Sequence, residues 1–280
     1  MNLIYYTLKV LEVTDLDYRS MLKNKKRIVV KVGTTSLTFA NGSLNLQRIE
    51  KLARVLTNLR NSGKEVVLVT SGAIGVGAER LALCERPRDI KGKQAAAAVG
   101  QAVLMQIYQK LFMEYNQIVA QILVTRRLVN DELMKFNAIN TFEELLKLGV
   151  IPIVNENDTI ATEEIEFGDN DTLSAVVASL IGADLLILLS DIEGLYTDDP
   201  RINKDAKLIP EVYSIDDNID SAAKDAKTKL GTGGMTTKIA AAKIAFESNI
   251  DVIIGNGENP EIVSRIIEGE RVGTLFVAKK

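Results

Sequence analysis

A glycine- and threonine-rich segment, GTGGMTTK at residues 231–238, has the composition of an anion-binding turn. It lies directly before a predicted helix. Glycines at a helix start let the backbone approach a phosphate closely, and the free N–H groups there attract negative charge. The same segment would also suit a flexible surface loop capped by threonine. It is not a Walker A loop, because the pattern G-x-x-x-x-G-K-[ST] is absent, and no G-x-G-x-x-G follows the first predicted strand.

Lys31 is a second candidate for binding an anion, because it interrupts the apolar run IVVKV at residues 28–32. A lysine inside such a strand is seldom fully buried unless it is paired. Its side chain either extends outward to solvent or points its ammonium group at an anionic site. The residue types alone leave both orientations open.

Further polar clusters lie at the ends of predicted strands. They are Gly33-Thr34-Thr35, Ser71-Gly72-Ala73, Asn155-Glu156-Asn157-Asp158 and Ser190-Asp191, and the run Gly168-Asp169-Asn170-Asp171 precedes a predicted helix. Taken singly, residues 71–73 could form a plain turn, residues 169–171 a solvated helix cap, and residues 197–200 a surface turn. In parallel α/β sheets, however, ligands bind beyond the carboxyl ends of the strands. The shared position of these clusters therefore predicts one common binding site.

The chain contains no histidine, which removes the usual general base and the commonest metal ligand. Its single cysteine, Cys84, excludes an intrachain disulfide and a cysteine-rich zinc site. The chemistry must therefore use Lys, Asp, Asn, Ser, Thr and backbone N–H groups. This set favours reactions that depend on electrostatics more than on proton transfer.

Short β-branched runs alternate with helical patterns along the chain. We predict strands over residues 28–32, 65–69, 118–124, 150–154, 184–189, 251–254 and 274–277, and helices over 45–61, 93–115, 137–148, 173–181, 236–248 and 261–268. Nearly continuous apolar strands such as IVVKV and DLLILL are typical of parallel strands covered on both faces. The predicted fold is therefore α/β, with a mostly parallel central sheet sandwiched between helices.

Length and composition bound the class of protein. The 280 residues carry a net charge of −3 with a pI near 5.4, which argues against a nucleic-acid scaffold. No apolar run is long enough to span a membrane and no signal peptide is recognisable, so we expect a cytoplasmic protein. We expect one domain over residues 23–280. Residues 1–22 would be an N-terminal extension, either an extra element on the domain surface or an arm reaching a neighbouring subunit.

These motifs together resemble the amino acid kinase family. The matching segments are KVGTTSL at 31–37, VTSGAIGVG at 69–77, NEND at 155–158, FGDND at 167–171, LLSDIEGLYTDDPR at 188–201 and GTGGMTTK at 231–238. Within the family, the set is most similar to the branch that phosphorylates the side-chain carboxylate of L-glutamate with ATP, in the first step of proline biosynthesis. The form expected here lacks the additional C-terminal PUA domain of many bacterial members.

The resemblance also implies roles for individual residues. The catalytic set would be Lys31 and Lys238, which bind the transferring phosphoryl group, and Asp171, which holds the lysines in place. The glutamate site would comprise Ser71, Gly72, Ala73, Asn155, Asp158, Asp169 and Asn170. The nucleotide site would comprise Lys31, Gly33, Ser190, Asp191, Thr232, Gly233, Gly234, Met235, Thr236, Thr237 and Lys238. No protein ligand of a metal is assigned.

The same resemblance implies ligands and partners. ATP would bind with Mg²⁺, and L-glutamate would be the acceptor. Proline is expected as a feedback inhibitor, a glutamyl-phosphate reductase as a partner, and a homo-oligomer (dimer or tetramer) as the assembled form. Three other readings stay open at this point: a kinase of the same fold acting on acetylglutamate or aspartate, a silent sensor of glutamate or proline, and an RNA-binding protein.

Overall fold

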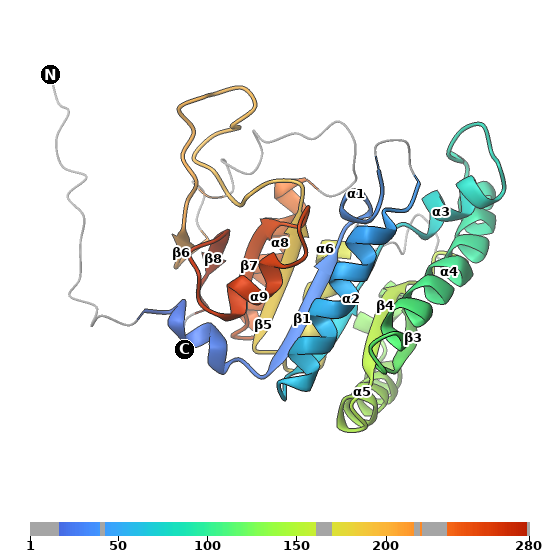
Figure 1. The fold of residues 1–280 in the computed structure, drawn as a ribbon, viewed down its shortest axis with the longest axis horizontal. Helices are drawn as coiled ribbons and strands as arrows, with labels where there is room; N and C mark the ends of the chain where they lie inside the picture. Colours follow the sequence, from blue (N-terminus) through green and yellow to red (C-terminus); the bar gives the residue numbers. More distant parts are fainter. Residues whose placement is uncertain (1–16, 40–42, 161–169, 216–218, 220–233, 279–280) are drawn as a thin grey trace, which may run out of the picture.

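The computed structural model describes residues 17–39, 43–160, 170–215, 219 and 234–278. In this part of the chain, eight strands form one sheet in the order β3-β4-β2-β1-β5-β7-β8-β6, with helices on both faces (Figure 1). Every strand pair is parallel except β7 with β8. The predicted class, a mostly parallel sheet between helices, is confirmed.

Along the chain, most of the strands are followed by a helix. Their bounds are β1 Arg27–Val32, β2 Glu65–Val69, β3 Val119–Val124, β4 Ile151–Glu156, β5 Leu185–Ser190, β6 Glu211–Val212, β7 Asp251–Asn256 and β8 Thr274–Phe276. β1 lies in the middle of the sheet, with Lys31 opposite Val69 of β2 and Leu188 of β5. Lys31 is therefore near the carboxyl end of a central strand, where parallel sheets bind ligands.

The helices cover both faces of this sheet. Their bounds are α1 Thr34–Leu37, α2 Leu46–Asn61, α3 Ala73–Arg80, α4 Ile90–Met113, α5 Glu132–Lys147, α6 Asn170–Leu180, α8 Met235–Glu247 and α9 Ile262–Ile267, with 3₁₀ turns η1 Ser20–Asn24 and η2 Arg126–Val129. Side chains cap three of the longer helices: Asn45, Asp89 and Asp131 each accept a hydrogen bond from a backbone N–H three residues on. Such caps satisfy N–H groups that the helix itself cannot.

Alternation along β1 explains which way Lys31 faces. Ile28 and Val30 belong to an apolar cluster with α2, α4 and α9, whereas Val29 belongs to a second cluster with α6 and α8 on the other face. Successive strand side chains point to opposite faces. Lys31 therefore shares the face of Val29 and points toward α6 and α8.

Several details differ from the sequence-based prediction. α1 and α3 were not expected, because their short glycine- and threonine-containing sequences look like strand-end turns. α5 begins at Glu132, five residues before the predicted start at 137, because Asp131 caps it. Asn155 and Glu156 lie inside β4 rather than after it. β8 runs antiparallel to β7.

Part of the predicted N-terminal extension packs on the domain. Leu22 is fully buried in the core, and Arg19 is 2% exposed. The Arg19 guanidinium donates to the backbone carbonyl oxygens of Pro210, Glu270, Val272 and Gly273 at 2.7–3.0 Å. Residues 17–24 therefore form a turn on the domain surface, while residues 1–16 lie outside the described part.

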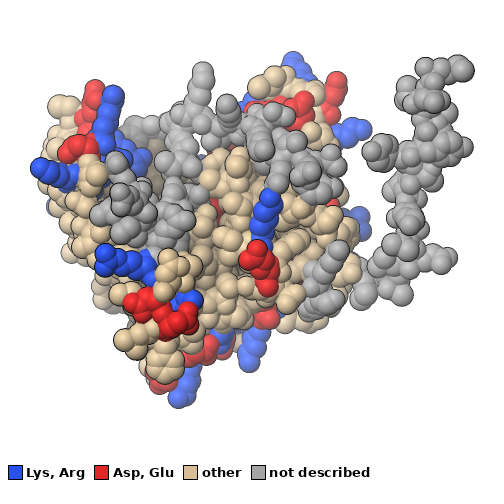
Figure 2. All heavy atoms as spheres, turned by 180° about the vertical axis from the view of Figure 1, so that it is seen from behind, with Lys and Arg blue, Asp and Glu red and all other residues tan. Residues whose placement is uncertain are grey.

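None of the helices described is both long and apolar enough to cross a membrane. On the face drawn in Figure 2, acidic and basic side chains are interspersed, and neither sign forms a continuous patch among the residues drawn in colour. A nucleic-acid-binding surface usually carries a basic stripe.

Candidate active site

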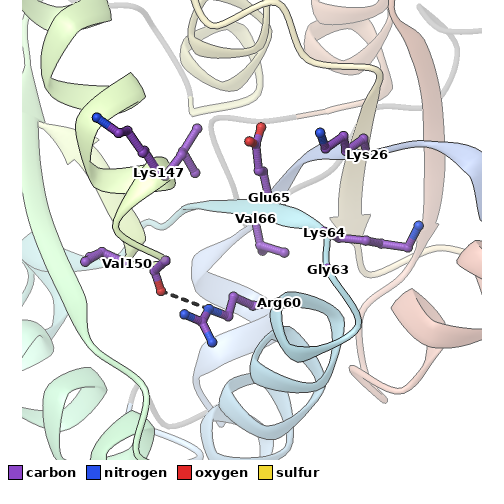
Figure 3. A pocket seen from close by; sticks show the side chains of 10 residues that line it. Lys26, Arg60, Gly63, Lys64, Glu65, Val66, Lys147 and Val150 are labelled. Carbon is purple, nitrogen blue, oxygen red and sulfur yellow. Dashed lines mark hydrogen bonds between the residues drawn. The ribbon is translucent and has the colours of Figure 1, made fainter.

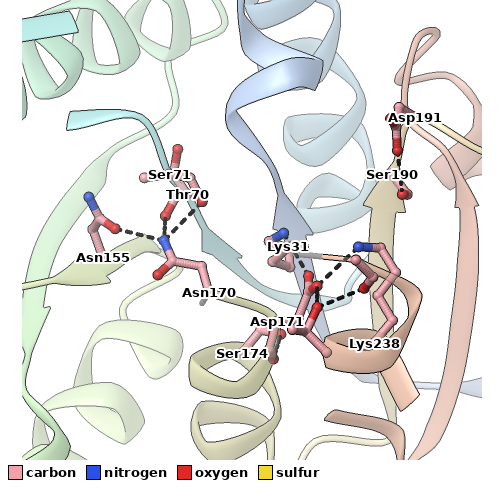
Figure 4. Close-up of polar contacts among 12 residues, drawn as sticks. Lys31, Thr70, Ser71, Asn155, Asn170, Asp171, Ser174, Ser190, Asp191 and Lys238 are labelled. Carbon is pink, nitrogen blue, oxygen red and sulfur yellow. Dashed lines mark hydrogen bonds and ion pairs between the residues drawn. The ribbon is translucent and has the colours of Figure 1, made fainter. Parts of the chain in front are cut away.

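Lys31, Lys238 and Asp171 come together beyond the middle of the sheet (Figure 4). The Lys31 ammonium lies 2.6 Å from Oδ1 of Asp171, and the Lys238 ammonium lies 3.0 Å from Oδ2 of the same carboxylate. Asp171 is 0% exposed, and the two lysines are 6% and 4% exposed. A strand and two helices, far apart in sequence, thus deliver three charges to one point.

Asp171 is ionised in this setting. Burial alone would raise its pKa, but the adjacent Lys31 and Lys238 ammonium groups outweigh burial and lower the pKa to about 2. At neutral pH one carboxylate therefore faces two ammonium groups, so the cluster carries a net positive charge. The net positive charge of this cluster would attract a further anion.

Two helix starts add to this positive field. Asp171 lies in the first turn of α6, and Lys238 lies in the first turn of α8, after Gly234 at the N-cap. The Thr237 hydroxyl contacts both Oδ2 of Asp171 at 2.9 Å and the Gly234 carbonyl oxygen at 2.8 Å. Because helix N-termini favour negative charge, both helices contribute to an anion site.

A second polar group lies beside this cluster, on the β2–β4 side. The Asn170 side-chain nitrogen donates to the Thr70 carbonyl oxygen, and it lies 2.9 Å from both the Ser71 hydroxyl and Oδ1 of Asn155. Three acceptors surround an NH₂ group with two hydrogens. The network therefore fixes the orientation of the Asn170 side chain.

Gly72 lets the chain turn sharply after β2. It has φ +101°, in the left-handed region that favours glycine, and it precedes Ala73 at the start of α3. A Cβ at Gly72 would also lie 3.5 Å from the Thr34 side chain. This turn brings the loops after β1 and β2 close together at the carboxyl edge.

Ser190 and Asp191 lie on the opposite side of the lysine cluster from Asn170 (Figure 4). Ser190 ends β5, its hydroxyl lies 3.1 Å from Oδ1 of Asp191, and its carbonyl oxygen accepts from Gly257 N at 2.7 Å. The order of strands β4, β2, β1 and β5 places Asn155, Ser71, Lys31 and Ser190 in a row along one edge. The edge thus has three parts. We call Ser71, Asn155 and Asn170 the amide half, Lys31, Lys238 and Asp171 the lysine centre, and Ser190 with Asp191 the Ser190 half.

The remaining predicted site residues fall into two groups. Gly33, Asp158, Met235 and Thr236 are described: Gly33 caps α1, Asp158 follows β4 in a turn, and Met235 is buried while Thr236 is exposed. Asp169, Thr232 and Gly233 lie outside the described residues.

Three residues near the site were not singled out from the sequence. Thr70 contributes its carbonyl oxygen to Asn170, and the buried Tyr108 contacts the Thr70 hydroxyl at 2.7 Å. Gln101 accepts from Asn155. Thr70 could have been found because it lies between strand residues and Ser71, but Tyr108 and Gln101 lie inside a long helix with no local signal.

The donor set suits an anion better than a protein-held metal. Asp171 already contacts a lysine with each of its oxygens. Within the described ranges, no three acidic or cysteine side chains gather where they could hold a metal ion. Magnesium prefers oxygen ligands and is often carried by substrate phosphates.

A hollow of about 250 Å³ lies at the opposite, amino-terminal edge of the sheet (Figure 3). Two of its cations donate to backbone groups: Arg60 donates to the Gly149 carbonyl oxygen at 3.0 Å, and Lys64 donates to two backbone carbonyls. In Figure 3 the ends of Lys26, Lys64 and Lys147 point apart. This basic hollow therefore lacks the convergence seen at the lysine centre.

The amino acid kinase family matches residues 26–256. The chain is 57% identical to a glutamate 5-kinase of Clostridium perfringens over 266 residues, covering 94% of this chain and 99% of the relative. It is 52% identical to a glutamate 5-kinase of Listeria monocytogenes, covering 94% and 96%.

Solved structures share the fold at low sequence identity. A UMP kinase from Bacillus anthracis aligns with a TM-score of 0.62 at 19% identity, covering 91% of this chain and 97% of that one. A carbamate kinase from Giardia lamblia, bound to AMP-PNP, aligns with a TM-score of 0.65 at 16% identity, covering 92% and 100%. At these identities the likeness concerns the fold alone.

Proposed function

Because the chain belongs to the amino acid kinase family, we propose that it transfers the γ-phosphoryl group of ATP to the side-chain carboxylate of L-glutamate, the reaction of its glutamate 5-kinase relatives. The observation that carries the proposal is the contact of Lys31 and Lys238 with one buried carboxylate. The product would be L-glutamyl 5-phosphate, in the first step of proline biosynthesis.

The three parts of the site suggest three tasks. The amide half, with Ser71, Asn155 and Asn170, binds glutamate together with Gly72, Ala73, Asp158 and Asp169. The Ser190 half, with Asp191, Gly33 and residues 232–238, binds ATP. The lysine centre lies between them, where the phosphoryl group must pass.

The chemistry needs charge compensation more than proton transfer. A glutamate side chain has an unperturbed pKa near 4.3 and is already a nucleophile at neutral pH. Its approach to a triphosphate is opposed by roughly 4 kcal/mol for each unit-charge pair at about 4 Å and an effective dielectric near 20. Lys31, Lys238 and the starts of α6 and α8 offset this repulsion and stabilise charge on the transferring oxygens.

Asp171 keeps the two lysines in place between turnovers. An ammonium group on a flexible stem loses side-chain entropy when it is fixed. By contacting both nitrogens, Asp171 fixes them before the substrates arrive. Positioning the two reactants in line accounts for much of the remaining acceleration.

Mg²⁺ enters this proposal with the nucleotide, where it neutralises phosphate charge. The carboxylate of the lysine centre, Asp171, already contacts both lysines, which agrees with a metal held by the phosphates. No protein ligand is assigned to it.

The proposed reaction also suggests a cellular location, an inhibitor and a partner. We place the enzyme in the cytoplasm and expect inhibition by proline, the pathway product. Glutamyl phosphate is a labile acyl phosphate, so direct transfer to a reductase would protect it from hydrolysis.

We also propose a homo-oligomer. Large apolar side chains are exposed at the β3 end of the sheet, where β3 is the edge strand: Ile118 is 70% exposed, and Leu133 and Phe136 on α5 are 70% and 61% exposed. A sheet edge with exposed large apolar side chains is typical of an interaction site. A second copy of the chain would cover it.

The direct test of the reaction is a hydroxamate assay with ATP and Mg²⁺. Hydroxylamine traps an acyl phosphate, so glutamate should give a coloured hydroxamate, while aspartate and N-acetylglutamate should give none. Adding proline tests the inhibition in the same assay. Equal product with another acid, or none with glutamate, would overturn the proposal.

A further inference from the structure

Gln101 is a buried residue of α4 that the reaction described above does not use. It is 7% exposed, and its side-chain oxygen accepts a hydrogen bond from Nδ2 of Asn155 at 2.8 Å. Among the described residues, its own Nε2 has no hydrogen-bond partner. A buried side-chain amide with one hydrogen-bonding atom unpaired lowers the stability of the fold. A glutamine at this position therefore needs a reason other than stability.

Asn155 shows what the glutamine contributes. Its Nδ2 donates to Gln101, while its Oδ1 accepts from the Glu156 N–H and from Asn170 Nδ2, both at 2.9 Å. The two ends of an amide have nearly the same shape and differ in whether they donate or accept. The Glu156 N–H, which needs an acceptor, and the Gln101 oxygen, which needs a donor, therefore hold Asn155 together with its Oδ1 facing Asn170.

The orientation of Asn155 in turn fixes that of Asn170. With Oδ1 of Asn155 facing it, Asn170 presents its nitrogen to Asn155 and to the Ser71 hydroxyl. A reversed Asn155 would place two NH₂ groups against each other. Gln101, Asn155, Asn170 and Ser71 therefore form one chain of oriented polar groups.

Close packing of α3 against α4 fixes the position of Gln101, where this series of polar groups begins. A Cβ on the neighbouring Gly100 would lie 1.8 Å from the Ala73 carbonyl oxygen and 2.5 Å from Gly77 N. The two helices α3 and α4 can approach this closely only because Gly100 has no side chain. The position of Gln101 is therefore tied to that of Ala73 and the Gly72 turn.

We propose that Gln101 is a positioning residue for the amino-acid substrate, acting through the orientation of Asn155. This rests on the proposed glutamate site, of which Asn155 and Asn170 are part. Gln101 does not touch the substrate, because its Nε2 is inaccessible to solvent and its Oε1 is occupied by Asn155. Its loss should weaken glutamate binding and leave the nucleotide half unaffected.

The test compares two variants of Gln101 with a control on the same helix. Gln101→Met keeps the volume and removes the acceptor, so the KM for glutamate should rise roughly tenfold, while kcat and the KM for ATP stay within about twofold. Gln106→Met, at an exposed position of α4, should leave all three parameters unchanged.

Gln101→Glu keeps an acceptor at this position, so it tests whether the acceptor restores the glutamate KM that Gln101→Met loses. Burial raises the pKa of a carboxyl group, and its neutral form can still accept from Asn155. The ratio of its glutamate KM to that of the wild type should therefore be near one at about pH 6 and grow toward about pH 9, as the carboxyl group ionises beside the anionic substrate.

The outcomes separate the two proposals. A Gln101→Met enzyme with an unchanged glutamate KM, or with only kcat lowered, overturns the role of Gln101. If that variant does not fold, a Gln101→Glu enzyme whose glutamate KM is already raised at about pH 6, where the acceptor is kept and the carboxyl group is neutral, overturns it. A wild-type chain that is inactive with glutamate overturns the proposed function and this inference together.

Discussion

Asn170 and Asp171 are neighbours in sequence, yet their side chains enter different halves of the site (Figure 4). Asn170 contacts Ser71 and Asn155, whereas Asp171 contacts Lys31 and Lys238. The first turn of α6 therefore links the amide half to the lysine centre within two residues. A shift of this turn would disturb substrate binding and phosphoryl transfer at once.

Asp171→Asn keeps the shape of the side chain and removes the charge that both lysines contact. We expect kcat to fall by at least about 100-fold, because the ammonium groups lose their anchor, while the KM for glutamate changes less. Steady-state kinetics measures this, with circular dichroism to show that the variant is folded. Asp205→Asn, at an exposed position, is the control. Turnover close to that of the wild type would refute the anchoring role.

The lowered pKa of Asp171 predicts a pH dependence of stability. The pKa is about 2 in the fold against a reference value of 3.8, so the ionised carboxylate stabilises the fold above the reference value and loses that contribution as the pH falls. The difference in free energy of unfolding between wild type and Asp171→Asn should stay constant from about pH 5 to 8 and shrink by roughly 1 kcal/mol near pH 3. Urea unfolding at each pH measures it. A difference that already changes between neutral pH and about pH 5 would contradict the assignment.

Gly77 and Gly75 provide a matched pair in α3. A Cβ at Gly77 would lie 1.7 Å from the Ala96 carbonyl oxygen, whereas one at Gly75 would meet nothing within 4 Å. Gly77→Ala should lower the free energy of unfolding by about 2 kcal/mol or more through overpacking. Gly75→Ala should be neutral or stabilising by about 0.5–1 kcal/mol, because alanine favours a helix. Equal effects of the two substitutions in thermal unfolding would show that the helices do not approach as described.

Phe136→Glu tests the proposed oligomer. Phe136 is 61% exposed on α5, so a charge there should leave the fold intact but disfavour burial against a second copy. Sedimentation velocity should show a shift toward monomer relative to the wild type. Lys147→Glu, farther along the same helix, is the control. A wild-type chain that is monomeric at all concentrations would end this proposal.

The sequence predicts the strands and long helices well, because their apolar periodicity reflects the two buried faces of the sheet. Lys31 stands out for the same reason, as a charge in an apolar run. The short helices α1 and α3 could not be predicted, since their glycines and threonines match a turn equally well. The packing of Gly77 against α4 favours a helix at α3, and this is a contact between segments distant in sequence.

The candidate site, like the fold, could be predicted from the sequence only in part. Strand-end position and the family resemblance bring Lys31, Asp171, Asn155 and Lys238 to one edge, and the structure places them there. Their roles in binding and catalysis stay predictions. Gln101 and Tyr108 could not be found, because a polar group inside a helix is visible only when the partner across the packing interface is known.

The most direct test of the central claim is the kinetics of Lys238→Ala. If Lys238 acts mainly on the transferring phosphoryl group, kcat should fall by at least about 100-fold, while the KM for glutamate rises no more than about threefold. Lys243→Ala, on the exposed face of the same helix, should behave as wild type. A Lys238→Ala enzyme that turns over at nearly the wild-type rate would remove this lysine from the mechanism.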